Sequence, residues 1–318
     1  MSEVTLESQL FDIIKDKEMP EHVKLAKLDM LVSLGINLEA KDNNGDTALI
    51  GASRDGNKEI AEFLIENGAE VDGKSRYGYT ALMFASVYDY SGITEVLLEK
   101  GADVNARSNS GSTALMCAAA NNCKNVLKIL LDNGADVYAK NKDDETALYY
   151  ASKYCHKEVV ELLVEEGAID NAARNYGGRT VLMYASRNCF KGVVEALIEN
   201  GADINAKDED GWTALMCAAY YGRKEVVELL IEKGADVEDR DEYGRTALFW
   251  ATLNKQKDVA VLLIEKGTNV KVLSETKPTV FDKIKDEETK IAVIGAIKKR
   301  NIKEKGMFVG CIKNLFER

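Results

Sequence analysis

Apolar residues along the chain form short clusters with helical spacing, and these clusters come in pairs. In the stretch TALMCAAYYGRKEVVELLIEKG, which begins at Thr213, the first cluster predicts a helix that the threonine can cap. Gly222 ends this helix, and KEVVELLIEK predicts a second one, with Glu225 favourably placed in its first turn. Gly234 follows where a left-handed C-cap is expected. The pattern therefore predicts two short helices followed by a turn.

This pair of clusters returns with a period of 33 residues. The first clusters open on Thr47, Thr80, Thr113, Thr146, Thr180, Thr213 and Thr246. The second clusters close on Gly68, Gly101, Gly134, Gly167, Gly201, Gly234 and Gly267. A single step of 34 places one inserted residue between Gly167 and Thr180. One such unit cannot bury its own apolar face, whereas stacked units can, so the repeat predicts a solenoid. We call the turn-rich segment that leads to each threonine a finger.

The stretch GWTALMCAAYYGRKEVVELLIEKGADV (211–237) and its copies from about 42 to 273 resemble the ankyrin repeat family over seven full units. The usual TPLH of that family is TALM, TALY or TALF here, in agreement with a content of only 2 Pro and 2 His. The resemblance implies an all-α repeat solenoid, with an antiparallel helix pair and a β-turn or hairpin finger in each unit. It also implies a curved stack.

Four segments are expected on this basis. They are N-terminal capping helices (1–41), seven repeats (42–273), a degenerate C-terminal capping repeat (274–300) and a basic amphipathic C-terminal helix (301–318). The last segment has apolar residues at helical spacing, namely Phe308, Cys311, Ile312, Leu315 and Phe316. It could cap the open end of the stack, or dock a partner helix or an anionic surface.

Composition narrows the function classes. A hydrophobic content of 46% suffices for a core, and a net charge of -11 argues against nucleic acid as a partner, although residues 296–318 carry a local +5. We expect no signal peptide and no membrane span. The six cysteines form no C-x-x-C pair, so reduced thiols in a cytoplasmic monomer are expected. Cys155, Cys189 and Lys255 replace the turn glycines of other units and should cost turn stability.

Signatures of catalysis are missing from the sequence. There is no H-E-x-x-H, G-x-S-x-G or G-x-G-x-x-G, and His22 and His156 lie far apart. The segment GAEVDGKS (68–75) matches a phosphate-binding loop, but a predicted helix precedes it and a turn follows it, so we interpret it as a finger. We predict a protein that is not an enzyme, with no catalytic residue, metal site or cofactor.

Partners of ankyrin proteins generally bind the fingers and the first helices. The corresponding positions lie one, three and four residues before each threonine, and seven and eight after it. Nine of these 35 positions are aromatic, although the overall rate of 7% predicts two or three. Five of the 11 arginines also fall there, but only two of the 31 lysines. This composition is typical of an interface. The predicted contact residues are Tyr77, Tyr79, Tyr88, Tyr154, Tyr176, Arg179, Arg187, Trp212, Tyr220, Tyr221, Tyr243 and Arg245.

Two alternatives to this interpretation remain open. Lysines could simply prefer the outer helices, and some tyrosines could pack on neighbouring fingers. The preferred function is a non-enzymatic interaction module, a scaffold or an inhibitor, that binds a protein through its concave face. The second function is a sensor of nucleotide-type small molecules. It would use Arg76, Tyr77 and Tyr79, or Lys153, Tyr154 and Arg187.

Overall fold

The computed structural model describes residues 5–169, 175, 177–188, 191–275 and 286–303. It divides into two compact units, residues 1–151 with 158–168 and residues 152–157 with 169–318, and each is described by itself. Several predicted features lie outside the described residues. They are Tyr176, Cys189, residues 170–174 of the segment with the one-residue insertion, and the amphipathic residues from Phe308 onward.

The first unit consists of an N-terminal helix pair followed by repeated pairs. The N-terminal pair is α1 (Leu6–Lys15) and α2 (Glu21–Ser33). The repeats are α3 (Ala48–Asp55) with α4 (Lys58–Glu66), α5 (Ala81–Val87) with α6 (Ser91–Glu99), and α7 (Ala114–Ala120) with α8 (Lys124–Asp132). Helix α10 (Lys157–Glu165) also belongs to this unit, whereas α9 (Ala147–Lys153) is divided between the two.

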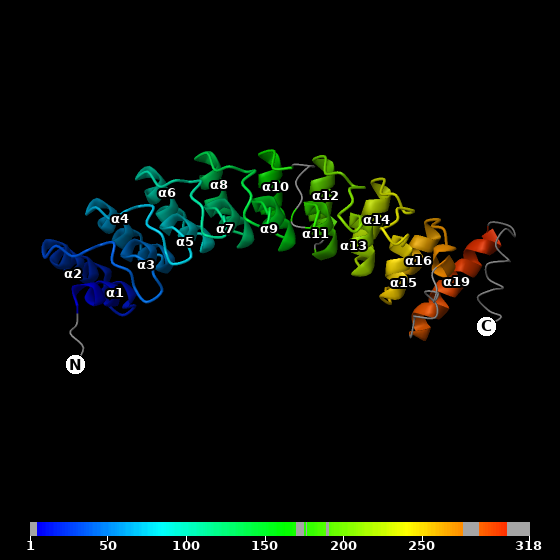
Figure 1. Cartoon of the computed structure of the whole chain (residues 1–318), viewed down its shortest axis with the longest axis horizontal. Helices are drawn as coiled ribbons and strands as arrows, with labels where there is room; N and C mark the ends of the chain where they lie inside the picture. Colours follow the sequence, from blue (N-terminus) through cyan, green and yellow to red (C-terminus); the bar gives the residue numbers. More distant parts are fainter. Residues whose placement is uncertain (1–4, 170–174, 176, 189–190, 276–285, 304–318) are drawn as a thin grey trace. The chain divides into compact units, whose positions relative to one another are not determined.

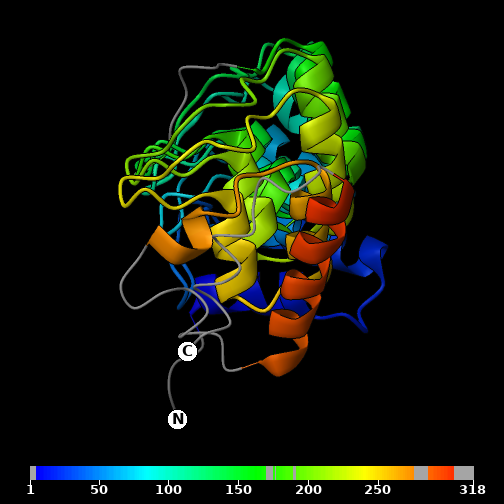
Figure 2. The ribbon, with the colours of Figure 1, turned by 90° about the vertical axis from the view of Figure 1, so that its right-hand side faces the viewer.

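The second unit continues the same arrangement. Its pairs are α11 (Val181–Asn188) with α12 (Lys191–Glu199), α13 (Ala214–Tyr220) with α14 (Lys224–Glu232), and α15 (Ala247–Leu253) with α16 (Lys257–Glu265). The short α17 (Val272–Glu275) and the longer α19 (Glu287–Lys303) follow, and α19 packs along α16 (Figure 2). Helix α19 runs past residue 300, where the sequence predicts the end of the capping repeat.

Within each unit the helices form two layers (Figure 1). First helices pack on first helices, as α3 does on α5 and α11 on α13, and second helices pack on second helices. The core between the layers is built from the same position of each repeat, and a leucine of every second helix is almost fully buried: Leu64, Leu97, Leu130, Leu163, Leu197, Leu230 and Leu263. The predicted all-α solenoid is confirmed. None of the described helices is long and apolar enough to cross a membrane.

Threonine caps every first helix, as the sequence predicts for Thr213. Its side-chain oxygen accepts a hydrogen bond from the backbone N–H three residues later, at 3.3 Å from Met216 N. The same bond recurs at the other six threonines, at 3.2 to 3.5 Å. The glycines after the second helices have left-handed backbone, which ends each helix. Residues 68–75 follow helix α4 and lead into a finger, so the apparent phosphate-binding motif has no strand before it.

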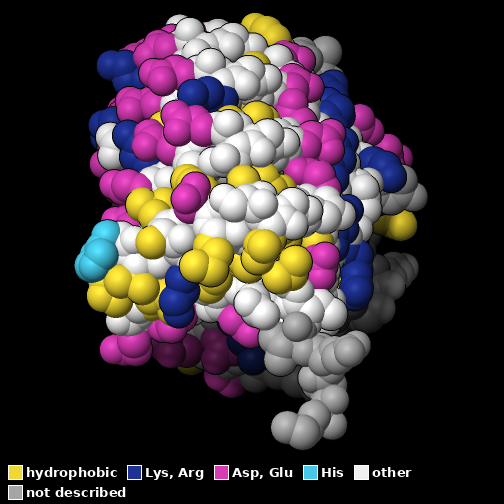
Figure 3. Space-filling view, turned by 90° about the vertical axis from the view of Figure 1, so that its left-hand side faces the viewer, with side chains coloured by type: hydrophobic (Ala, Val, Ile, Leu, Met, Phe, Trp, Pro, Cys, Tyr) yellow, Lys and Arg dark blue, Asp and Glu magenta, His cyan; other side chains and the backbone are white. Residues whose placement is uncertain are grey.

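The N-terminal end of the first unit leaves apolar side chains uncovered. Met30 and Leu34 are 66% and 62% exposed, and Leu6 is 36% exposed. Figure 3 views this end of the molecule and shows hydrophobic side chains gathered on it. This end is therefore less polar than the outer face that a solenoid cap usually presents.

In the six repeats whose turn the structure describes, the turn between the two helices is left-handed whichever residue occupies it. Gly222 has φ +68°, and Cys155 and Lys255 have φ +63° and +61°. An L-residue in this conformation costs on the order of 1 kcal/mol. The strained backbone predicted at these two positions is thus present.

We expect Lys255→Gly to raise the free energy of unfolding of the second unit by about 1 kcal/mol, because glycine relieves this strain and the lysine is exposed. Urea unfolding followed by tryptophan fluorescence measures it, since both tryptophans of the chain lie in that unit. Gly222→Ala is the reverse control, because a Cβ there would clash with the Gln256 side chain. Equal stability of wild type and Lys255→Gly would contradict the prediction.

Candidate functional site

The fingers are organised by one polar residue in each repeat, buried or half-buried, five positions before the threonine. We call it the finger anchor. The anchors are Asp42, Ser75, Ser108, Asn141, Asn175, Asp208 and Asp241. The backbone N–H of each anchor donates to the carbonyl four residues later, at 2.9 to 3.1 Å, which closes the turn. The anchor side chain accepts from backbone N–H groups of the same finger, as Asp208 Oδ1 does from Trp212 N at 2.8 Å. The finger side chains are therefore held on a fixed backbone.

In the second unit the fingers and first helices enclose one pocket of about 350 Å³. We call it the aromatic pocket. It is lined by Arg179, Met183, Tyr184, Arg187, Trp212, Cys217, Tyr220, Tyr221 and Trp250. Five of these nine described side chains are aromatic, two are guanidinium groups, and none is a carboxylate. The volume is within the range of small-ligand pockets, or of a pocket for one or two side chains of a partner.

Four of the five rings that line this pocket pack on one another. The ring centroids of Trp212 and Trp250 lie 4.6 Å apart, and Tyr220 lies 5.6 and 5.7 Å from these two rings. Tyr221 continues the cluster at 4.8 Å from Tyr220. Rings that are already in contact lose little conformational freedom when a ligand binds, so the cluster is preorganised.

The arginines around the pocket differ in whether a carboxylate pairs with their guanidinium group. Arg179 Nε donates to Asp208 Oδ2 at 3.3 Å. Arg245 Nε donates to Asp241 Oδ2 at 2.7 Å while its guanidinium lies 4.2 Å from the Trp250 ring centroid. Arg187 lies over the Tyr221 ring at 4.7 Å, and its Nε is buried with no hydrogen-bond partner in the part of the chain that the structure describes. Among the described residues no carboxylate pairs with Arg187 either.

Cys217 lies in the same pocket as an unreactive thiol. Burial raises its pKa to about 12, and the charge of Asp208 adds to this effect, whereas Arg179 and Arg187 oppose it. The thiolate, the nucleophilic form, is therefore scarce near neutral pH. Its role in the pocket is that of an apolar lining residue.

The first unit has a related pocket of about 330 Å³ at equivalent positions. It contains Tyr77, Tyr79 and Phe84, and Tyr79 packs on Phe84 at 5.7 Å. Its cation Arg54 forms an ion pair with Asp46, which also lines the pocket. This pocket therefore has fewer rings than the aromatic pocket, and its half-buried guanidinium already has a carboxylate partner.

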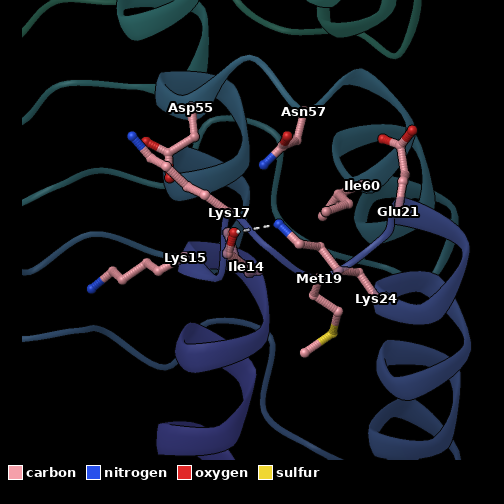
Figure 4. Close-up of a pocket in the computed structure, with 9 residues that line it drawn as sticks. All are labelled: Ile14, Lys15, Lys17, Met19, Glu21, Lys24, Asp55, Asn57 and Ile60. Carbon is pink, nitrogen blue, oxygen red and sulfur yellow. Dashed lines mark hydrogen bonds between the residues drawn. The ribbon is translucent and has the colours of Figure 1, made fainter.

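A third pocket, of about 310 Å³, lies where the N-terminal helix pair meets α3 and α4 (Figure 4). Lys24 is buried there, and its Nζ donates to the carbonyl of Ile14 at 3.2 Å. Lys15 is paired with Asp42. Lys24 binds a carbonyl at the end of α1, so its ammonium group stabilises the C-terminus of that helix. None of the described residues that line this pocket is aromatic.

Comparison with protein families identifies the repeat. A sequence model described as ankyrin repeats (3 copies) matches residues 21–108, 115–208 and 206–274. The chain belongs to the ankyrin repeat family. A comparison with curated proteins finds no match. Ankyrin repeats are in general protein–protein interaction modules, and the matched range contains both pockets of the fingers and first helices.

The ankyrin repeats bring together only some of the residues that the sequence singles out. Arg179, Arg187, Trp212, Tyr220 and Tyr221 share the aromatic pocket, and Tyr243 borders it through Arg245, whose guanidinium lies 4.3 Å from the Tyr243 ring. Tyr77 and Tyr79 share the first-unit pocket. Tyr88 stacks on Tyr90, and Tyr154 lies beside His156, outside both pockets. Tyr176 is outside the described residues.

Sequence reasoning missed the fourth residue after each threonine. In the aromatic pocket this position supplies Tyr184, Cys217 and Trp250, and in the first-unit pocket it supplies Phe84. The signal was present, because four of the seven repeats have an aromatic residue at this position. It lies one helical turn before the predicted positions seven and eight, and hence on the same side of the first helix.

Proposed function

We propose that this ankyrin repeat chain is a non-enzymatic binding module, a scaffold or an inhibitor, that holds a protein partner against its fingers and first helices. The aromatic pocket is the centre of the binding surface. The observation that supports this most is the preorganised cluster of four packed rings, with Tyr184 and two arginines in the same lining, since tyrosine, tryptophan and arginine dominate binding hot spots.

Two tyrosines at the edge of this cluster are exposed, as expected for residues that contact a partner rather than form the core. Tyr221 and Tyr243 are 38% and 70% exposed. Tyr221 packs on Tyr220 and Tyr243 on Arg245, and both of these neighbours contact buried Trp250. Aromatic side chains with two rotatable angles give a large contact area at low entropic cost. A partner that covers Tyr221 and Tyr243 would bury the exposed parts of these two rings, whose other parts already pack on neighbouring side chains.

Substitution of the exposed tyrosines is expected to remove the partner. Tyr221→Ala with Tyr243→Ala should weaken binding at least about tenfold, because central aromatic contacts are each worth roughly 1 to 2 kcal/mol or more. Co-purification of tagged variants with quantitative mass spectrometry measures the retained partners. Lys224→Ala with Glu225→Ala, on the exposed side of α14 in the same unit, is the matched control.

A partner list that is the same for both variants and the wild type would overturn this assignment. Circular dichroism of each variant separates lost binding from lost structure.

We also propose that the module is monomeric and acts in the cytoplasm. The reduced thiols of Cys117, Cys123 and Cys217 support a reducing compartment, and light scattering of the purified chain measures the mass.

A further inference from the structure

We propose that the aromatic pocket recognises a carboxylate flanked by an apolar side chain, supplied by an acidic residue of the partner or by its C-terminus. This inference rests on the proposed function, because it assumes that the ligand is a protein segment. Its basis is Arg187, which lines the aromatic pocket together with five aromatic side chains and whose positive charge has no carboxylate partner among the described residues.

The repeat itself shows what Arg187 lacks. In the first repeat, the residue before the threonine and the seventh after it are Asp46 and Arg54, which form an ion pair. The equivalent positions of the fifth repeat are Arg179 and Arg187. Two cations therefore stand where the first repeat has a cation and an anion.

Arg179 and Arg187 are not equivalent within this second pair. Arg179 is neutralised by the buried carboxylate of Asp208, the finger anchor of the next repeat. Arg187 has a buried Nε with no acceptor among the described residues, and an unsatisfied buried donor is unfavourable. The pocket thus carries one unmatched positive charge, and a bound carboxylate would supply the missing counter-charge.

Arg187 meets the pocket beside an aromatic ring. Its guanidinium carbon lies 4.7 Å from the Tyr221 ring centroid, and the side chain is part of the pocket lining. The in-plane donors of a guanidinium match the two oxygens of a carboxylate. The apolar side chains of Met183, Trp212 and Tyr220 line the rest of the pocket and favour a hydrophobic neighbour of that carboxylate.

Charge also distinguishes this ligand from two others. A cation such as a methylated lysine would meet two guanidinium groups and no carboxylate among the described lining residues. A phosphate dianion would bring two negative charges to one unmatched positive charge. A monoanion is the ligand that balances the pocket.

Tryptophan fluorescence tests the inference directly, because both tryptophans of the chain line this pocket. The probe is N-acetyl-phenylalanine, and its neutral amide is the matched control. A probe of this size should bind with a Kd on the order of 1 mM. The carboxylate should bind about tenfold more tightly than the amide. N-acetyl-phenylalanyl-glutamate amide reports whether a side-chain carboxylate binds as well as a chain end.

Arg187→Gln should remove the preference for the carboxylate, whereas Arg54→Gln, at the equivalent position of the first repeat, should leave it unchanged. Arg187→Lys keeps the positive charge but lacks the paired, in-plane N–H donors of a guanidinium, so it should retain only part of the preference. Equal binding of acid and amide, no saturable binding of the acid, or tighter binding of phenyl phosphate would each overturn the inference.

The two proposals can fail separately. If Tyr221→Ala with Tyr243→Ala releases the protein partner but Arg187→Gln retains it, the surface is correct and the carboxylate is wrong. If the probe binds through Arg187 but the partner list of the tyrosine variant is unchanged, the pocket takes a small carboxylate and the protein-binding function is wrong.

Discussion

Asp208→Ala is expected to lower the free energy of unfolding of the second unit by about 3 kcal/mol. The carboxylate of this finger anchor accepts hydrogen bonds from Asp210 N at 3.0 Å and Trp212 N at 2.8 Å, and its other oxygen pairs with Arg179. Alanine would leave these donors without their acceptor and a guanidinium without its counter-charge. Each unsatisfied buried donor costs about 1 to 3 kcal/mol, and loss of the ion pair adds only about 1 kcal/mol, because Arg179 is 42% exposed. Urea unfolding followed by tryptophan fluorescence measures the loss.

Asp208→Asn is the matched control, because the protein itself uses asparagine as the anchor of another finger. Asn141 Oδ1 accepts from two backbone N–H groups of its finger, both at 2.9 Å. The Asp208→Asn variant would therefore still build the turn and lose only the charge opposite Arg179, for which we expect about 1 kcal/mol. A loss of the same size in both variants would show that the ion pair, rather than the finger, carries the effect.

The finger anchor also explains why this substitution should affect binding. Trp212 is on the finger that Asp208 holds, and it packs on Trp250 at the base of the aromatic pocket. Loosening the finger would displace one wall of the pocket. Asp208→Ala should therefore weaken binding of the carboxylate probe as well as stability, whereas Asp208→Asn should retain most of it.

Most of the fold follows from the sequence, because it depends on local signals repeated every 33 residues. Threonine before an apolar cluster specifies a cap, and glycine after one specifies a left-handed helix end, and the structure has both in each repeat. Repetition removes the usual uncertainty about which segments pack together, since each helix contacts the equivalent helix of the next repeat.

The binding surface was predictable only in part. Aromatic enrichment singles out Trp212, Tyr220 and Tyr221, which the structure brings into one pocket. The same count includes Tyr88 and Tyr154, which lie outside both pockets. Enrichment counts residue types on a face, whereas a pocket depends on which neighbouring rings meet.

Charge pairing was the part that the sequence could not specify. The predicted contact positions contain equal numbers of acidic and basic residues, which suggests a face of no net charge. The structure shows that this balance is not local. Asp208 and Asp241 are buried anchors that each take an arginine, and Arg187 is left without an anion among the described residues. Because these pairs join different repeats or span a turn, their identity depends on side-chain geometry.

Raising the pH from 8 to 10 is expected to lower the free energy of unfolding by about 1.4 kcal/mol for each fully buried thiol. Burial raises the pKa of Cys117 and of Cys217 from 9.0 to about 12. At pH 10 the unfolded chain has released these protons and the folded chain still holds them. The unfolded state then binds fewer protons, so stability falls with pH, from about pH 9 to about pH 12. Urea unfolding at several pH values measures the slope.

Cys217→Ala isolates this contribution in the second unit. The variant should be less stable near neutral pH, because it removes a buried sulfur atom, but its stability should fall less steeply above about pH 9. Lysines and tyrosines that titrate in the same range are common to both proteins, so the difference between the two slopes reports the thiol alone. Parallel slopes would mean that the Cys217 thiol ionises as easily in the folded pocket as in the unfolded chain. That result would also contradict the burial of Cys217 in the lining of the aromatic pocket.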